Sequence, residues 1–206
     1  TIADPVNRQV YALQPYLSST MEGTKLYHQD NRHLVKWRKF PARSPNSHGQ
    51  YTKVYIRANT TIEGCQSLRS LMADTTEPIG VLNFASATRP GGGWRTGASA
   101  QEESIARSST LFLALESQKV RPFYDIHQFN PNPFYTHTMI YSPDILIFKD
   151  DKGGWIKPFL VDVLTSPAVN AKEVRKLPWY HVGVEKKIED TMRERMGRIL
   201  ELFEYR

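Results

Sequence analysis

One stretch of the sequence, residues 81–107, constrains the fold more than any other part of the chain. It opens on a short apolar run of the kind found in a strand covered on both faces: Val81, Leu82, Phe84 and Ala85. Pro90 ends this strand, and three consecutive glycines follow it. A helix is then predicted from Gln101 through Leu115, with two adjacent glutamates in its first turn. A strand, a glycine turn and a helix in this order predict one unit of a layered α/β fold.

The glycine turn admits two interpretations. Gly91, Gly92 and Gly93 can take positive φ and let a ligand approach the backbone closely. N–H groups left free by such a turn suit a phosphate group. Three glycines can equally form a flexible turn that binds nothing. Because the spacing fits neither GxGxxG nor GxxxxGK[ST], the sequence predicts neither a Rossmann dinucleotide site nor a P-loop.

The two carboxylates at the start of the predicted helix also admit two interpretations. Ser99 and Glu102 have the spacing of a capping box, in which Glu102 closes the helix N-terminus. Glu103 would then be a first-turn acid favoured by the helix dipole. Capping does not explain why two acids lie so close to a turn that suits an anion. Cleavage of a glycosidic bond would use both features, since a carboxyl group assists the leaving group and stabilises an oxocarbenium-like transition state.

The glycine turn, a short spacer and Gln101–Glu102–Glu103 resemble the GGG…QEE signature of the poly(ADP-ribose) glycohydrolases, and the detail is most similar to the microbial type. Two further blocks carry the resemblance: NTTIEGCQSL at 59–68 and MIYSPDILIFKDDKGGWIKPFLVDVLTSPAVNA at 139–171. The resemblance implies a macrodomain-like fold, with three α/β/α layers and a mixed central sheet, over residues 51–206. Residues 1–50 are expected to be a helical and loop extension.

The resemblance also implies a reaction and the residues that perform it. Glu103 would protonate the leaving ribose oxygen and then activate water, while Glu102 would orient the ribose hydroxyls. The residues expected to bind substrate are Asn83, Ser86, Gly91, Gly92, Gly93, Trp94 and Gln101. No metal and no other cofactor is expected.

Three of these side chains, those of Asn83, Ser86 and Trp94, have alternatives that the sequence leaves open. Asn83 and Ser86 follow a buried strand, where a polar group either contacts a ligand or bonds to a neighbouring loop. Trp94 either covers the ligand or packs on the protein. Gln101 is expected to support the glycine loop.

The rest of the chain supports the same α/β class. Strands are predicted at residues 53–57, 139–141, 145–148 and 159–164, and helices at residues 6–17, 61–71 and 188–205. Thr60 and Glu63 form a capping box for the helix at 61–71. Residues 117–138 are predicted to be a loop with aromatic anchors, and residues 150–154 a solvated turn. The polar residues that end the last predicted strand, Thr165 and Ser166, are expected to line the same cleft as the glycine turn.

The charge and the cysteine content of the chain limit the kinds of partner and the cellular compartment that are expected. The net charge of +6 suits a polyanion such as ADP-ribose polymer on modified proteins. The basic residues are scattered and accompany no zinc or helix-turn-helix pattern, so sequence-specific nucleic-acid binding is not expected. The single cysteine, Cys65, excludes an intrachain disulfide and favours a reducing compartment, cytosol or nucleus. No apolar run long enough for a membrane span and no signal-peptide core are present.

The sequence ends at Arg206, where the family pattern continues with a strand and a glycine-containing segment. We therefore expect an open sheet edge. A nicked chain whose remainder is a second chain, a split or truncated gene, or another element in place of the missing strand would each account for it, and we favour the first. Two alternative functions remain: an ADP-ribose reader that does not cut, and a hydrolase of mono-ADP-ribosylated targets. A basic RNA- or DNA-binding domain is a third, and it predicts affinity that falls steeply with salt.

Overall fold

The main sheet of the protein is mixed. The computed structural model describes residues 2–3, 8, 10–39, 53–72, 75–130, 132–178 and 182–206. Within these residues the main sheet has four strands in the order β3-β5-β6-β4. Their bounds are Lys25–Tyr27 for β3, Gly80–Ala85 for β4, Met139–Lys149 for β5 and Trp155–Pro167 for β6. Only the β4–β6 pairing is parallel. A separate small sheet pairs β1 (Ile2–Ala3) with β2 (Val10–Tyr11).

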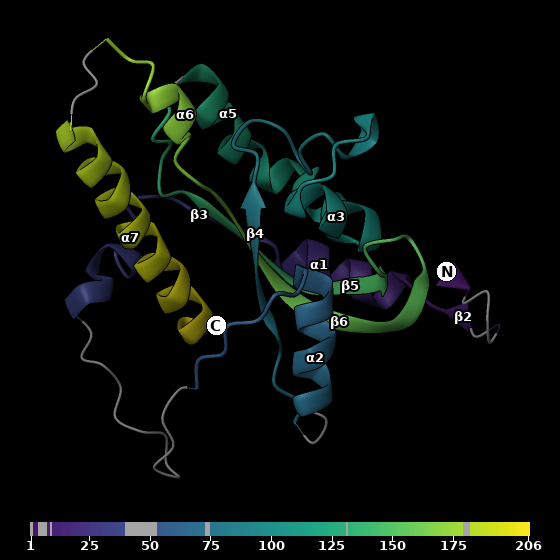
Figure 1. Ribbon diagram of the computed structural model, residues 1–206. Helices are drawn as coiled ribbons and strands as arrows, with labels where there is room; N and C mark the ends of the chain where they lie inside the picture. The colour runs from purple at the N-terminus through teal and green to yellow at the C-terminus, as the bar shows by residue number, and fades with distance from the viewer. Residues whose placement is uncertain are drawn as a thin grey trace.

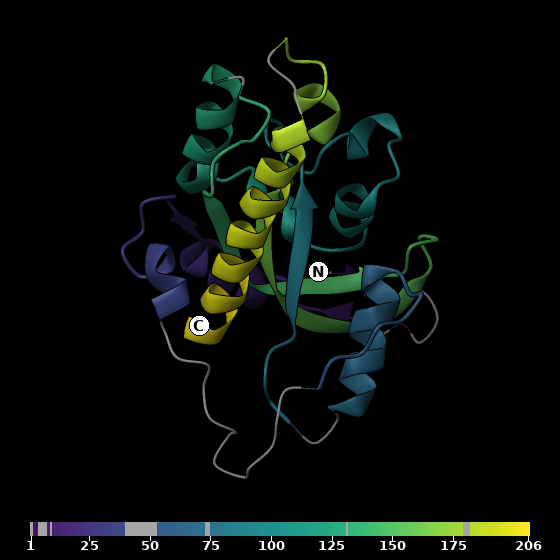
Figure 2. The ribbon, with the colours of Figure 1, turned by 60° about the vertical axis from the view of Figure 1, so that its left-hand side comes forward.

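Helices cover both faces of the main sheet, and Figure 1 shows β4 between α7 on one side and α2 and α3 on the other. The helices are α1 (Gln14–Gly23), α2 (Thr61–Leu71), α3 (Gln101–Ser108), α4 (Leu111–Leu115), α5 (Arg121–Phe129), α6 (Ala171–Val174) and α7 (Val182–Tyr205). Three short 3₁₀ turns accompany them: η1 (Leu34–Lys39), η2 (Trp94–Thr96) and η3 (Gln118–Val120). Figure 2 shows α7 running across the sheet. This arrangement confirms the predicted α/β class.

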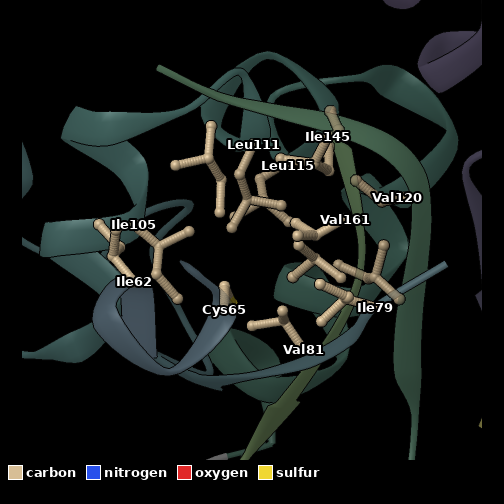
Figure 3. Packing of buried hydrophobic residues seen from close by; sticks show 14 of the residues in the cluster. Ile62, Cys65, Ile79, Val81, Ile105, Leu111, Leu115, Val120, Ile145 and Val161 are labelled. Carbon is tan, nitrogen blue, oxygen red and sulfur yellow. The ribbon is translucent and has the colours of Figure 1, made fainter. Parts of the chain in front are cut away.

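The core is divided by the sheet, as the alternation of side chains along β6 requires. Val161 and Val163 belong to a large cluster with α2, α3, α4 and α5, part of which Figure 3 shows. Leu164 points the other way, into a smaller cluster with Ile199 and Leu202 of α7. The two clusters produce the three predicted layers.

Several elements agree with the sequence predictions. The strand β4 and the helix α2 lie where the patterns place them, and the Thr60–Glu63 capping box is formed in both directions. The helix predicted at 188–205 begins earlier, at Val182. The strand predicted at 159–164 is longer at both ends.

Several predicted elements are wrong. Residues 53–57 form no strand, and Val54 and Ile56 are 82% and 97% exposed, because no strand among the described residues pairs with them. Part of the predicted loop at 117–138 is the helix α5, which Pro122 favours at the first turn. The strands predicted separately at 139–141 and 145–148 form one strand, β5, with a register shift of the bulge type between Ser142 and Ile145. The helix predicted from Gln101 to Leu115 breaks at Ser109, whose extended backbone forms a bridge with Ile147.

The helix predicted at residues 6–17 is also wrong in its position. Residues 10–11 belong to β2, and α1 begins at Gln14, where Pro15 can occupy the first turn. Residues 4–7 and 9 lie outside the described residues. The segment 25–39 contributes β3 to the main sheet and η1 to the packing against α7.

Candidate functional site

The site lies at the carboxyl ends of the two parallel strands. Asn83 in β4 is paired in register with Thr165 in β6, and its Nδ2 donates to Thr165 Oγ1 at 3.2 Å. Both side chains are fully buried. The structure therefore brings together the two polar strand ends that the sequence placed in one cleft, and it adds Thr165 as a direct partner of Asn83.

The helix α3 places two carboxyl groups beside these strand ends. Glu102 Oε2 accepts a hydrogen bond from Ser86 N at 2.6 Å, and Glu102 Oε1 lies 3.4 Å from Asn83 Nδ2. Glu103 Oε1 accepts from Gly93 N at 2.8 Å. Both glutamates are buried, at 3% and 8% exposure. Their carboxyl groups thus bind the end of β4 and the glycine turn.

The predicted capping box at the start of α3 is wrong. The N-cap residue is Ala100, which has no capping side chain, and no bond joins Ser99 to Glu102. The Glu102 carboxylate bonds instead to the backbone beyond β4. Glu102 thus forms a hydrogen bond to a residue distant in the sequence, and not the local capping bond that its spacing from Ser99 allows.

The glycine turn lies directly over the carboxyl groups. Gly91 and Gly92 have φ of +67° and +62°, in the left-handed region that favours glycine. A Cβ at Gly92 would lie 2.2 Å from Glu103 Oε1. The turn therefore requires glycine both for its conformation and for the space that Glu103 occupies.

The backbone N–H groups of this turn already have partners. Gly93 N donates to Glu103, Gly92 N donates to Arg89 O at 3.0 Å, and a bond from the Gly91 backbone lowers the pKa of Glu102. The sequence predicted that these groups would be free for an anion. In this structure the acidic groups that the turn binds are the protein's own, those of Glu102 and Glu103.

The charge state of Glu102 is set mainly by its burial. Removal from water is the main reason why the pKa of Glu102 is raised to about 7, and the nearby charge of Glu103 acts in the same direction. Hydrogen bonds from Ser86 N and Asn83 act in the opposite direction. Near neutral pH the Glu102 carboxyl group is therefore present in both protonation states.

Gln101 binds the outer edge of β4. Its Nε2 donates to Leu82 O at 2.7 Å and to Thr61 Oγ1 at 3.1 Å, while its Oε1 accepts from Phe84 N at 2.9 Å. This differs from the predicted support of the glycine loop. The amide of Gln101 pairs with β4 much as a residue of a neighbouring parallel strand would.

Ser86 and Trp94 both make structural contacts. The Ser86 hydroxyl accepts from Thr88 N and Arg89 N, at 3.4 and 3.2 Å, and so shapes the loop that leads to the glycines. The Trp94 ring packs edge-on against Phe112 with centroids 4.5 Å apart. These are the structural alternatives that the sequence left open, and they leave the Ser86 and Trp94 backbones beside the site.

Tyr124 is a site residue that the sequence analysis placed in a loop. It lies on α5 at 2% exposure, and its hydroxyl has no hydrogen-bond partner within the described residues. Burial raises the pKa of Tyr124, and the charge of Glu102 adds to this effect. The sequence signal that could have predicted this helix is Pro122, which suits the first turn of a helix, followed by aromatic residues.

A hollow of about 490 Å³ opens beside the site between α2 and α3. Its lining includes Thr60, Phe84, Gln101, Ser104 and Asp151. Within the described residues, no group of three His, Cys, Asp or Glu side chains is arranged to bind a metal ion.

The fold and the site together define a class of protein: an α/β enzyme of the glycosidase type, with a buried pair of carboxyl groups under a glycine turn. Residues 5–150 match the family model "Microbial-type PARG, catalytic domain", where PARG stands for poly(ADP-ribose) glycohydrolase. The chain belongs to this family and is a glycosidase that acts on ADP-ribose polymer.

Solved structures agree with the family assignment. The chain is 31% identical to poly(ADP-ribose) glycohydrolase from Thermomonospora curvata, with a TM-score of 0.84 over 99% of this chain and 69% of that one. The same enzyme bound to the inhibitor ADP-HPD matches at 30% identity and a TM-score of 0.81, over 99% and 68% of the two chains. The enzyme from Deinococcus radiodurans in complex with ADP-ribose matches at 31% identity and 0.79, over 95% and 73%.

A search of curated protein sequences found no match. Among the described residues, no helix has the length and apolar character that a membrane span needs.

Proposed function

We propose that this chain hydrolyses the ribose–ribose O-glycosidic bond of ADP-ribose polymer at the paired glutamates under the glycine turn. The observation that carries the proposal is the contact between Gly92 and Glu103, because it places a carboxyl group against a stretch of bare backbone. A sugar can approach such a backbone closely. The inhibitor and ADP-ribose complexes of the two bacterial relatives support a ligand of this chemistry.

In the proposed mechanism, Glu103 is the general acid and base. It protonates the ribose oxygen that leaves, and the resulting carboxylate then takes a proton from the attacking water. The Gly93 N–H group fixes one oxygen of this carboxyl group, which leaves the other oxygen to exchange the proton. No metal is required for these two proton transfers.

The neighbouring residues would position the sugar. Glu102 would orient the ribose hydroxyls, and a carboxyl group with a pKa of about 7 can both accept from and donate to a hydroxyl group near neutral pH. Asn83 has a buried Oδ1 with no partner within the described residues, which is available to a ligand hydroxyl. The three glycines would let the diphosphate and its ribose approach the backbone closely, beside Ser86 and Trp94, and Gln101 would complete the substrate-binding set.

Glu103→Gln tests this mechanism. The amide can still accept from Gly93 N but cannot act as an acid, so we expect polymer cleavage to fall about 1,000-fold. The affinity for ADP-ribose, measured by calorimetry, should stay within about threefold. Glu77→Gln removes the same charge from an exposed position and should change neither value.

Three results would overturn the proposal. ADP-ribose binding without cleavage by the parent chain would indicate a reader. Cleavage of mono-ADP-ribosylated protein but not of polymer would indicate the second alternative. No ADP-ribose binding, with nucleic-acid binding that falls steeply with salt, would indicate the third.

We also propose that a strand from outside residues 1–206 completes the main sheet at β4, supplied by a second chain. Within the described residues no strand pairs with the outer edge of β4. The two helices that flank it in Figure 1 expose large apolar side chains: Leu68 and Leu71 in α2, Met196 and Leu200 in α7. Open edges of this kind are normally covered. Slow hydrogen exchange in the isolated chain of outward β4 amides other than Phe84 N, which Gln101 already binds, would contradict this proposal.

A further inference from the structure

The tip of the hairpin between β5 and β6 is well fixed by its own hydrogen bonds. Asp150 Oδ1 accepts from Lys152 N and Gly154 N at 2.9 and 2.7 Å. Asp150 N donates to Gly154 O at 2.8 Å, and Gly153 N donates to Asp150 O at 3.1 Å. Asp150 therefore uses its side chain to shape the turn, and Asp151 projects from a defined position.

Asp151 is an exposed turn residue, as the sequence predicted, and it also connects two helices. Its Oδ2 accepts from Thr60 Oγ1, the N-cap of α2, at 2.6 Å. Its Oδ1 accepts from Ser104 Oγ of α3. Thr60 keeps its capping role, since its hydroxyl oxygen also accepts from Glu63 N at 3.2 Å. One carboxylate thus joins the starts of two helices that are separated by forty residues of sequence.

The contact between the hairpin tip and α3 extends along one face of the helix. Ser104 and Ser108 lie one turn apart, so they face the same direction. Ser108 Oγ donates to Asp150 O at 3.1 Å, beside the bond from Ser104 to Asp151. The two bonds fix the rotation of α3 about its axis with respect to the hairpin.

The helix α3 has little to fix it internally. It has only eight residues, and its N-terminus has no side-chain cap. Isolated helices of this length are not stable in water. Its orientation therefore depends on side-chain bonds to its surroundings: Gln101 to β4, Ser104 and Ser108 to the hairpin tip, and Arg107 to Ala98 O at 2.6 Å.

We propose that Asp151 is a positioning residue for Glu103, acting through Ser104, the next residue along α3. If the hairpin tip releases Ser104, α3 can rotate, and the Glu103 carboxyl group turns away from Gly93. The expected fall in kcat rests on the proposed function. The expected change in the orientation of α3 rests on the hydrogen bonds alone. A misplacement of a catalytic group by about 1 Å can lower a rate by as much as about 100-fold.

The first experiment compares Asp151→Ala with Asp150→Asn. Both remove one negative charge from the hairpin tip, but the side-chain amide introduced by Asp150→Asn keeps the acceptor oxygen that shapes the turn. In Asp151→Ala we expect kcat on polymer to fall about tenfold, KM to stay within about twofold, and amide hydrogen exchange in α3 to rise about tenfold. Asp150→Asn should have the same kcat, the same KM and the same α3 hydrogen exchange as the parent.

The second experiment tests whether Asp151 acts through Ser104. Ser104→Ala should lower kcat about as much as Asp151→Ala, and the double variant should be no worse than either single variant. Losses that multiply in the double variant would overturn the proposed connection. An increase in KM with unchanged kcat in Asp151→Ala would also overturn it, because Asp151 would then contact the substrate itself.

The exchange measurement separates this inference from the proposed function. A parent chain that cleaves no polymer would contradict the function, while faster exchange in α3 of Asp151→Ala would still support the positioning role. Unchanged α3 exchange in Asp151→Ala would overturn the positioning role even if the parent is active.

Discussion

At the residue scale, the burial of Glu102 links the stability of the fold to pH. Its pKa is raised from an ordinary value of 4.5 to about 7, so the folded chain binds this proton more tightly than the unfolded chain does. The resulting stabilisation is complete below pH 4.5 and is lost as the pH rises to about 7. From the size of the shift, the loss amounts to about 3 kcal/mol.

Glu102→Gln should remove this part of the pH dependence, because the amide does not titrate. We expect the free energy of unfolding, measured with urea from pH 4.5 to 8, to fall less steeply with pH in the variant than in the parent. The exposed variant Glu77→Gln should keep the parent's slope. An unchanged slope in Glu102→Gln would show that Glu102 is ionised throughout this range.

At the scale of elements, the side chain of Gln101 closes part of an open sheet edge. Parallel pairing of β4 with β6 leaves Leu82 O and Phe84 N pointing outward, and the Gln101 amide satisfies both at 2.7 and 2.9 Å. The first residue of α3 is therefore bound to the strand whose end carries the site. These bonds fix the first residue of α3 against β4.

Gln101→Ala should lower the free energy of unfolding by about 2 kcal/mol, because two backbone groups lose their partners. Gln101→Glu keeps an acceptor for Phe84 N but has no donor for Leu82 O, so it should also be less stable than the parent at pH 8. Urea denaturation measures both. If Gln101→Glu is as stable as the parent, the bond to Leu82 contributes nothing.

At the scale of the whole molecule, the amino-terminal segment is attached to the last helix. A Cβ at Gly197 in α7 would lie 2.3 Å from the Trp37 ring of η1. Arg198 Nη1 donates to Gln29 O, and Arg38 pairs with Glu194 at 3.2 Å. The division of the chain at residue 50 stays a prediction, but residues 25–39 pack on the same core as the rest.

Gly197→Ala should therefore lower the free energy of unfolding by about 2 kcal/mol, since the added methyl group displaces Trp37. Gly64→Ala is the matched control in α2. Nothing lies within 4 Å of its added Cβ, so it should raise stability by about 1 kcal/mol through helix propensity. Equal effects of the two substitutions in urea denaturation would show that Trp37 does not pack on α7.

Local features of the sequence determined the parts of the site that depend on neighbouring residues. Glycine is favoured at positive φ, so three consecutive glycines were enough to predict the turn at 91–93, where Gly91 and Gly92 have positive φ. The Thr60–Glu63 capping box needs only residues within one helical turn. The apolar run of β4 and the 3.6-residue period of α7 reflect burial on one or both faces, and both elements lie where those patterns placed them.

Tertiary structure decided every feature whose partner is distant in the sequence. Residues 53–57 have a strand pattern but no strand beside them, so they stay extended and exposed. Glu102 has a local candidate for capping in Ser99, yet it accepts from the more distant Ser86 N instead. Asp151 is an exposed turn residue, as predicted, but its bonds to Thr60 and Ser104 depend on the fold because both partners are distant in the sequence. The sequence by itself determined which groups could form the site, whereas the packing of β4, α3 and the hairpin decided which of them meet, because a hydrogen bond forms only where folding has already brought both partners together.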